Sequence, residues 1–280
     1  MKAKKLLSIL LSVLMLTSAF PVIGTEAEST QKLTLDASLS SIASNANTSI
    51  IPTTEQIGAA AITEGVAPFV QRAEKNLTSG AWSYASVAKP SSYANWNILI
   101  DGSAAQTDNH GVSYLSACVD NDNQMVYLDG SRMFVDYILD LGDYYDLSAI
   151  NVVGGHEGNL NPGSYNIYAA SRYDAQKGKD NFTDNELLIS YVNDSRDGLP
   201  VRTQTFRVNE GEKLVARYVC LRILNPNSET RKTWVEDYKT MAGYFLDVRL
   251  AEFRAYGTKA DAEDLEQFVD LTLENNSQSI

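Results

Sequence analysis

The second half of the chain is a series of short segments in which apolar and polar residues alternate, with turn residues between them. In residues 134–141 every second side chain, from Val135 to Leu141, is apolar, and Asp136 and Asp140 stand among their neighbours. Successive side chains of a β-strand point to opposite faces, so this pattern predicts a strand with one face in a core and the other in water.

Similar segments recur at short intervals along the chain. We expect strands near Val152 and over Ser164–Ala170, Leu187–Val192, Thr203–Val208, Arg217–Leu224 and Tyr244–Tyr256. Clusters of Asn, Asp, Pro and Gly between these segments indicate turns. None of the segments is followed by a long amphipathic helix, which argues against a parallel β-α-β sheet. The sequence therefore predicts an all-β fold, an antiparallel β-sandwich, over residues 72–258.

The two ends of the chain have a different composition. Residues 1–27 combine a basic start, an apolar run over Leu6–Phe20 and small residues after it, the pattern of a secretory signal peptide. We therefore expect a secreted, extracellular protein. Residues 28–71 are rich in Ser, Thr, Ala and Asn and are expected to form a disordered linker. In residues 259–280, apolar residues at helical spacing over Asp261–Leu273 predict a short helical tail.

The charge and the cysteines limit the possible functions. The formal net charge of −12 argues against nucleic acid as a partner, because phosphate binding needs a basic surface, and against an anionic membrane. Cys118 and Cys220 are the two cysteines. In an exported protein they could form a disulfide or remain free thiols, and the sequence leaves both alternatives open.

The final strand carries a carboxylate in an unusual position. Alternation over Leu246–Glu252 places Glu252 on the same face as Leu246 and Leu250, toward the core. An unpaired buried carboxylate costs several kcal/mol, so Glu252 needs a partner. A bound cation, an arginine, or a bulge that turns the side chain outward would each meet this need.

Six motifs occur in an order that resembles a known family. They are Lys75–Gly80, Asn97–Gly102, Tyr137–Gly142, Pro162–Tyr168, Ala216–Ile223 and Val248–Gly257. Together they resemble the discoidin or coagulation-factor type C domain, a galactose-binding-like jelly roll whose relatives include the family 32 carbohydrate-binding modules. The segment between Gly102 and Phe134 is longer than the family pattern, and Cys220 stands where a polar residue is common.

The resemblance implies a structural Ca²⁺ site. By position, its ligands would be Asp101, Ser103 or nearby carbonyls, Thr107 or Asp108, and Glu252. Ca²⁺ takes six to eight oxygen ligands, which a tight glycine-containing loop can supply. The alternative is a hydrogen-bonded turn in which backbone amides satisfy Glu252.

Loop residues of the kind that bind sugars follow two of the predicted strands. His156 and Asn159 come after one strand, and Arg231, Trp234 and Tyr238 lie in the long loop before Tyr244. Sugar sites pair an aromatic face with polar groups that grip hydroxyls. For Trp234, burial in the core is the competing interpretation, and for His156 a hydrogen-bonded surface position.

No catalytic motif accompanies these residues. The sequence contains no metalloprotease, P-loop, Rossmann or nucleophile-elbow signature, and the two histidines, His110 and His156, are far apart. We therefore expect no enzyme. The leading hypothesis is a non-catalytic bacterial module that binds an extracellular glycan or glycoprotein. The alternative is a protein-binding adhesion module of the same fold.

Overall fold

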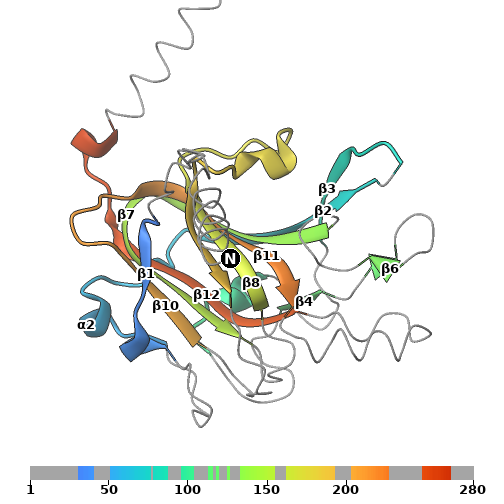
Figure 1. Cartoon of the computed structure of the whole chain (residues 1–280). Coiled ribbons are helices and arrows are strands. Elements are labelled where there is room, and N and C mark those ends of the chain that lie inside the picture. Colours follow the sequence, from blue (N-terminus) through green and yellow to red (C-terminus); the bar gives the residue numbers. More distant parts are fainter. Residues whose placement is uncertain are drawn as a thin grey trace, which may run out of the picture. The chain divides into compact units, whose positions relative to one another are not determined.

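A computed structural model of the chain describes residues 31–40, 51–76, 78–87, 96–103, 113–115, 118–119, 125–126, 133–154, 162–192, 203–226 and 248–265. The strands are β1 (Leu33–Leu35), β2 (Ala67–Lys75), β3 (Trp82–Ser86), β4 (Ser113–Leu115), β5 (Cys118–Val119), β6 (Met125–Val126), β7 (Met133–Gly154), β8 (Pro162–Ala170), β9 (Leu187–Val192), β10 (Thr203–Val208), β11 (Val215–Pro226) and β12 (Val248–Lys259). The helices are short: η1 (Ala37–Leu39), α2 (Thr54–Ile57), η2 (Trp96–Leu99) and η4 (Gly178–Asn181). The predicted all-β, antiparallel fold is confirmed, because every pair of these strands is antiparallel (Figure 1).

The long strand β7 takes part in both layers of the β-sandwich. Its first part, residues 133–140, lies between β2 and β11, and β8 and β9 extend this layer. Its second part, residues 145–154, lies between β12 and β10, and β4 and β1 extend the other layer. The two layers are thus one folded sheet joined through β7.

The passage between the two layers depends on Gly142. This residue has φ +78°, a conformation that favours glycine, and its amide donates to the Asp140 carboxylate at 3.0 Å. A Cβ atom here would lie 2.7 Å from the Gly65 carbonyl oxygen. Backbone conformation and close packing therefore both require glycine at this position.

The main core lies between the layers and contains the apolar face predicted for β7. Val135, Tyr137, Leu139 and Leu141 are all at most 1 % exposed. They belong to one cluster with residues of β8, β10, β11 and β12, among them Phe206. Full burial of each such side chain stabilises the fold by about 1.5–3 kcal/mol, so this predicted face supplies much of the core.

The opposite face of β7 is not in water, which corrects the prediction for Asp136. Asp136 is fully buried, and Arg222 of β11 donates to its two carboxylate oxygens at 2.8 and 2.9 Å. The Tyr84 hydroxyl donates to the same carboxylate at 2.7 Å. A second apolar cluster, which includes Ile138, Phe182 and Cys220, covers this face. Cys220 is a free, buried thiol.

The segment expected to be a linker also differs from the prediction where it is described. β1 pairs with β10, and Leu33 is 2 % exposed within the main core. Thr53 and Gln56 form a reciprocal capping box at the start of α2. These elements are three to four residues long. An apolar period cannot be recognised over so few residues, so the composition of the segment concealed them.

The tail begins as predicted, with helix at residues 262–265. The Asp264 amide donates to the Asp261 carboxylate at 3.0 Å, and the Asp261 amide donates back to Asp264. This reciprocal pair caps the helix start in the way Ser/Thr and Glu usually do. Within the described ranges, no helix has the length and apolarity needed to cross a membrane.

Candidate functional site

Glu252 lies at a bulge in β12. Leu250 pairs with Gly154 and Glu252 with Val153, so one residue is inserted into β12 between these two pairs. The alternation resumes at Phe253, which joins Leu250 in the main core. Glu252 therefore leaves the core face on which the sequence had placed it, yet its side chain is 0 % exposed.

The turn after η2 delivers a second carboxylate to Glu252. Asp101, Gly102 and Ser103 follow η2, and Gly102 has φ +82°. The Ser103 amide donates to Asp101 Oδ1 at 2.8 Å and to Glu252 Oε1 at 2.8 Å. One backbone N–H thus joins the turn to the last strand.

Arg254 lies beside the same carboxylate. Its Nε is 2.8 Å from Glu252 Oε2, although neither atom makes a well-directed hydrogen bond. Its Nη2 donates to the Ile100 carbonyl at 2.8 Å. A Cβ on Gly102 would come within 3.1 Å of Nη2, so glycine leaves room for the guanidinium.

The cluster has an excess of carboxylates. Burial, together with a hydrogen bond to the neighbouring Asp101 carboxyl group, raises the pKa of Glu252 to about 9, and the charge of Arg254 only partly opposes this. The two carboxyl groups share the Ser103 amide, and the Arg254 guanidinium lies beside Glu252. A further positive charge beside the pair would favour the ionised form of Glu252.

Some of these residues could serve as ligands of a Ca²⁺ ion. Asp101, Glu252 and the Ser103 hydroxyl are oxygen donors, the type that Ca²⁺ prefers, and Glu252 Oε2 is buried without a directed hydrogen bond. No third His, Cys, Asp or Glu joins the pair among the described residues. Thr107, the other predicted ligand, lies outside them.

The sequence left open whether a cation, an arginine or a bulge accommodates Glu252, and these three solutions do not exclude one another. The bulge and the arginine are both present, and a backbone amide contributes as well. Arg254 was missed as a member of the site. Its signal was its position two residues after Glu252, which puts both side chains on one face of the strand.

The five predicted ligand-binding residues, His156, Asn159, Arg231, Trp234 and Tyr238, lie outside the described residues. The strand ends on either side of these loops are described, and they pair with one another across the sheet. Pro162 of β8 pairs with Pro226 of β11, and Gly154 of β7 pairs with Leu250 of β12. The two loops thus begin and end at the same end of the sheet. Glu252 pairs with Val153, one residue from that end.

Comparison with known proteins gives matches to solved structures only. No protein-family model matches the sequence, and no curated protein does. A fucolectin from striped bass serum (Morone saxatilis) matches at 12% identity and TM-score 0.40, over 72% of this chain and 50% of the fucolectin. A family 32 module from a Clostridium perfringens family 31 glycoside hydrolase matches at 13% identity and TM-score 0.41, over 71% of this chain and 95% of the module.

A third match is the family 32 module of C. perfringens NanJ, solved in complex with galactose. It has 13% identity and TM-score 0.38, and the match covers 70% of this chain and 97% of the module. These structural neighbours are carbohydrate-binding modules and a lectin, and the family 32 modules are the group that the six sequence motifs resemble. The chain spans about half the length of the fucolectin. Because the three TM-scores are below 0.5, they assign no ligand and no residue role to this chain.

Proposed function

We propose that the chain is a secreted, non-catalytic module that binds extracellular carbohydrate through the loops containing His156, Asn159, Arg231, Trp234 and Tyr238. A structural Ca²⁺ ion would bind nearby, held by Asp101, Ser103, Thr107 and Glu252. The proposal rests on the six ordered motifs and on the geometry of the described residues.

The observation that carries the proposal is the convergence of Asp101 and Glu252. The resemblance implied that the Asp-Gly turn and the closing glutamate, which lie in separate motifs, would meet at a cation. Ser103 donates one amide hydrogen to both carboxylates, which brings them together at the end of the sheet where the ligand loops start. The order of the motifs led us to expect Asp101 and Glu252 close together, whereas strand alternation alone placed Glu252 in the core.

The ion would have a structural role. It would hold the turn after η2 against β12 and would favour the charged form of Glu252, whose pKa is raised mainly by burial and by the neighbouring Asp101 carboxyl group. A catalytic role for the carboxyl pair is not supported. Glycosidase carboxylates stand about 5–9.5 Å apart on either side of the substrate, whereas Asp101 and Glu252 accept from the same Ser103 amide and Glu252 is fully buried.

The proposed ligand is a neutral sugar. The net charge of −12 disfavours capture of polyanions, and Trp234 offers an aromatic face for the C–H side of a pyranose. Solvent-exposed hydrogen bonds contribute little net free energy, so stacking would supply most of the selectivity.

Affinity electrophoresis through gels that contain neutral polysaccharides, together with a glycan array, tests the proposal. We expect retardation by at least one neutral polysaccharide, and normal migration when free sugar competes. Absence of retardation by any glycan, with capture of a protein partner instead, would support the adhesion module and contradict the proposal.

A further inference from the structure

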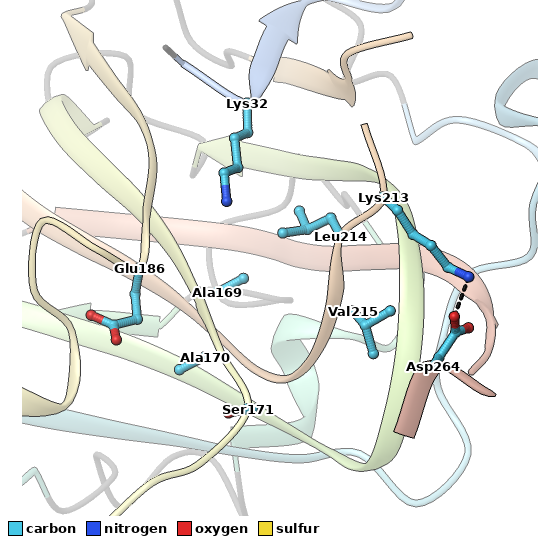
Figure 2. A pocket seen from close by; sticks show the side chains of 9 residues that line it. All are labelled: Lys32, Ala169, Ala170, Ser171, Glu186, Lys213, Leu214, Val215 and Asp264. Carbon is cyan, nitrogen blue, oxygen red and sulfur yellow. Dashed lines mark hydrogen bonds and ion pairs between the residues drawn. The ribbon is translucent and has the colours of Figure 1, made fainter. Parts of the chain in front are cut away.

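A cavity of about 330 Å³ (Figure 2) lies at the C-terminal end of β8, opposite the end at which Pro162 adjoins the segment of His156. It is formed where β8 ends, where β11 begins and where the C-terminal helix starts. Its lining residues are Lys32, Ala169, Ala170, Ser171, Glu186, Lys213, Leu214, Val215 and Asp264. β8 has nine residues, so about 25 Å separates the cavity from the end of β8 that adjoins the loop of His156. The volume is at the lower end of the range for small-molecule pockets.

Lys32 brings an unpaired positive charge into this cavity, and Figure 2 shows its side chain extending between Glu186 and Leu214. The main chain of Lys32 is fixed on both sides: its amide donates to the Leu188 carbonyl at 2.9 Å, and its carbonyl accepts from the Asn209 amide at 3.0 Å. In the described part of the chain, its ammonium has no ion-pair or hydrogen-bond partner. The fold thus holds a free cation at the mouth of the cavity.

The acidic residues of the lining are already engaged. Asp264 pairs with the Lys213 ammonium through Oδ1, and its Oδ2 accepts from the Asp261 amide (Figure 2). Glu186 accepts through Oε2 from the amide and the hydroxyl of Thr183.

Among the charged side chains that line the cavity, more hydrogen-bond donors than acceptors are unused. A lysine ammonium has three N–H donors and no acceptor. Lys32 keeps all three, and Lys213 uses one of its donors for Asp264. Free acceptors on the acidic side chains are few, because Asp264 uses both oxygens and Glu186 uses one. An acceptor-rich ligand with a negative charge fits this balance.

We propose that the cavity is a second binding site, which takes a monosaccharide-sized ligand carrying one carboxylate, the class represented by the uronic acids. The carboxylate would pair with Lys32, hydroxyls would contact Ser171 and Lys213, and the C–H groups would lie on Ala169 and Leu214. A phosphate fits less well, because its charge of about −1.5 to −2 exceeds that of one free ammonium and Glu186 stands nearby.

Chemical-shift mapping of the ¹⁵N-labelled secreted chain tests this site with galacturonate, galactose and acetate as probes. We expect galacturonate to shift the amides of residues 169–171 and 213–215. Galactose should leave these amides unchanged, and acetate should bind at least tenfold more weakly than galacturonate. The loop-end site of the proposed function would instead shift amides near Gly154 and Ser164, so failure of one site is distinguishable from failure of the other.

Substitutions of Lys32 complete the test. Lys32→Gln should weaken galacturonate binding by about tenfold or more, because a charge-assisted hydrogen bond is lost. Lys32→Arg should stay within about threefold of the parent, and Lys75→Gln, which makes the same charge change outside the cavity, should have no effect. Unchanged affinity in Lys32→Gln, absence of galacturonate shifts at the cavity, or equal affinity for acetate and galacturonate would overturn the proposal.

Discussion

The carboxyl groups of Asp101 and Glu252 accept hydrogen bonds from one backbone amide, that of Ser103, and lie in contact with each other. Glu252 is inside the protein, whereas Asp101 is exposed, so the pair spans the boundary between the interior and solvent. Arg254 supplies the guanidinium beside Glu252. A cation arriving from solvent would therefore meet Asp101 first and Glu252 behind it.

Removal of Ca²⁺ should lower the melting temperature by several degrees. A site that binds only the folded state stabilises it by about 2.7 kcal/mol at a hundredfold excess of ligand over the dissociation constant, and 1 kcal/mol corresponds to about 2–4 °C for a chain of this size. Thermal melts with added Ca²⁺ and with chelator measure the difference.

Asp101→Ala should abolish this chelator effect while the β-sheet circular dichroism is retained. Asp184→Ala is the matched control, because Asp184 is exposed in a turn away from the site and its loss should leave the effect intact. Identical melting curves of the parent with Ca²⁺ and with chelator would contradict the ion.

Loss of Arg222 should destabilise the protein strongly. Its guanidinium is paired with the fully buried Asp136 and lies 4.1 Å from the centroid of the Phe134 ring. Removal of one partner of a buried ion pair typically costs about 3–5 kcal/mol, because the other charge is left uncompensated. Urea unfolding of Arg222→Ala measures this cost.

The double variant Arg222→Met with Asp136→Leu is the control for the ion pair. It replaces both charges by apolar groups of similar size and should recover most of the lost stability. If Arg222→Ala costs less than about 1 kcal/mol, the pair does not organise this face of the sheet.

Gly142→Ala should destabilise the fold more than Gly211→Ala. Both glycines have positive φ, +78° and +84°, but a Cβ at Gly211 meets nothing within 4 Å, whereas one at Gly142 meets the Gly65 carbonyl at 2.7 Å. We expect a cost of about 1–2 kcal/mol at Gly211 and about 1–3 kcal/mol more at Gly142. Equal denaturation midpoints for the two variants would show that the backbone relaxes at the bend of β7.

Acid should destabilise the protein partly through Asp140. Burial would raise the pKa of this carboxyl group, but hydrogen bonds from Arg217 and the Gly142 amide outweigh burial and hold the pKa below its usual value. The stabilisation from this group is present above the unfolded pKa of about 4 and is lost as pH falls through the lower folded pKa. Between neutral pH and about pH 3, the urea midpoint should therefore decline less steeply in Asp140→Asn than in the parent. Equal declines in the two proteins would show that Asp140 does not contribute to the acid sensitivity.

The sequence predicted those parts of the fold that depend on local alternation. β9 and β10 occupy the expected ranges, and the odd residues from Val135 to Leu141 in the first part of β7 face the core. It could not predict that Asp136 is buried, because its partner Arg222 comes from a strand far along the chain and an ion pair leaves no periodic signal. β1 and α2 were missed because each spans only three or four residues and is ordered by tertiary contacts.

The candidate cation site was partly predictable. Asp101, Ser103 and Glu252 were found through the motif order, and they lie together. The bulge that moves Glu252 off the core face was not predictable. A bulge is an extra residue in one strand relative to the strand it pairs with, and the sequence does not show which strand that is. The cavity at Lys32 was missed for a related reason: Lys32 lies in a segment whose composition resembles a linker, and the other lining residues come from segments that are far apart in the sequence.

Titration calorimetry of the chain with a neutral sugar that retards it in affinity gels tests the central claim most directly. For the parent we predict a dissociation constant of about 0.1–1 mM, equivalent to about −4 to −5.5 kcal/mol. Trp234→Ala should reduce the affinity more than His156→Ala, and neither should change the melting temperature. Unchanged sugar affinity in Trp234→Ala, or unfolding of that variant, would contradict the account, because Trp234 would then be a core residue and not part of a carbohydrate site.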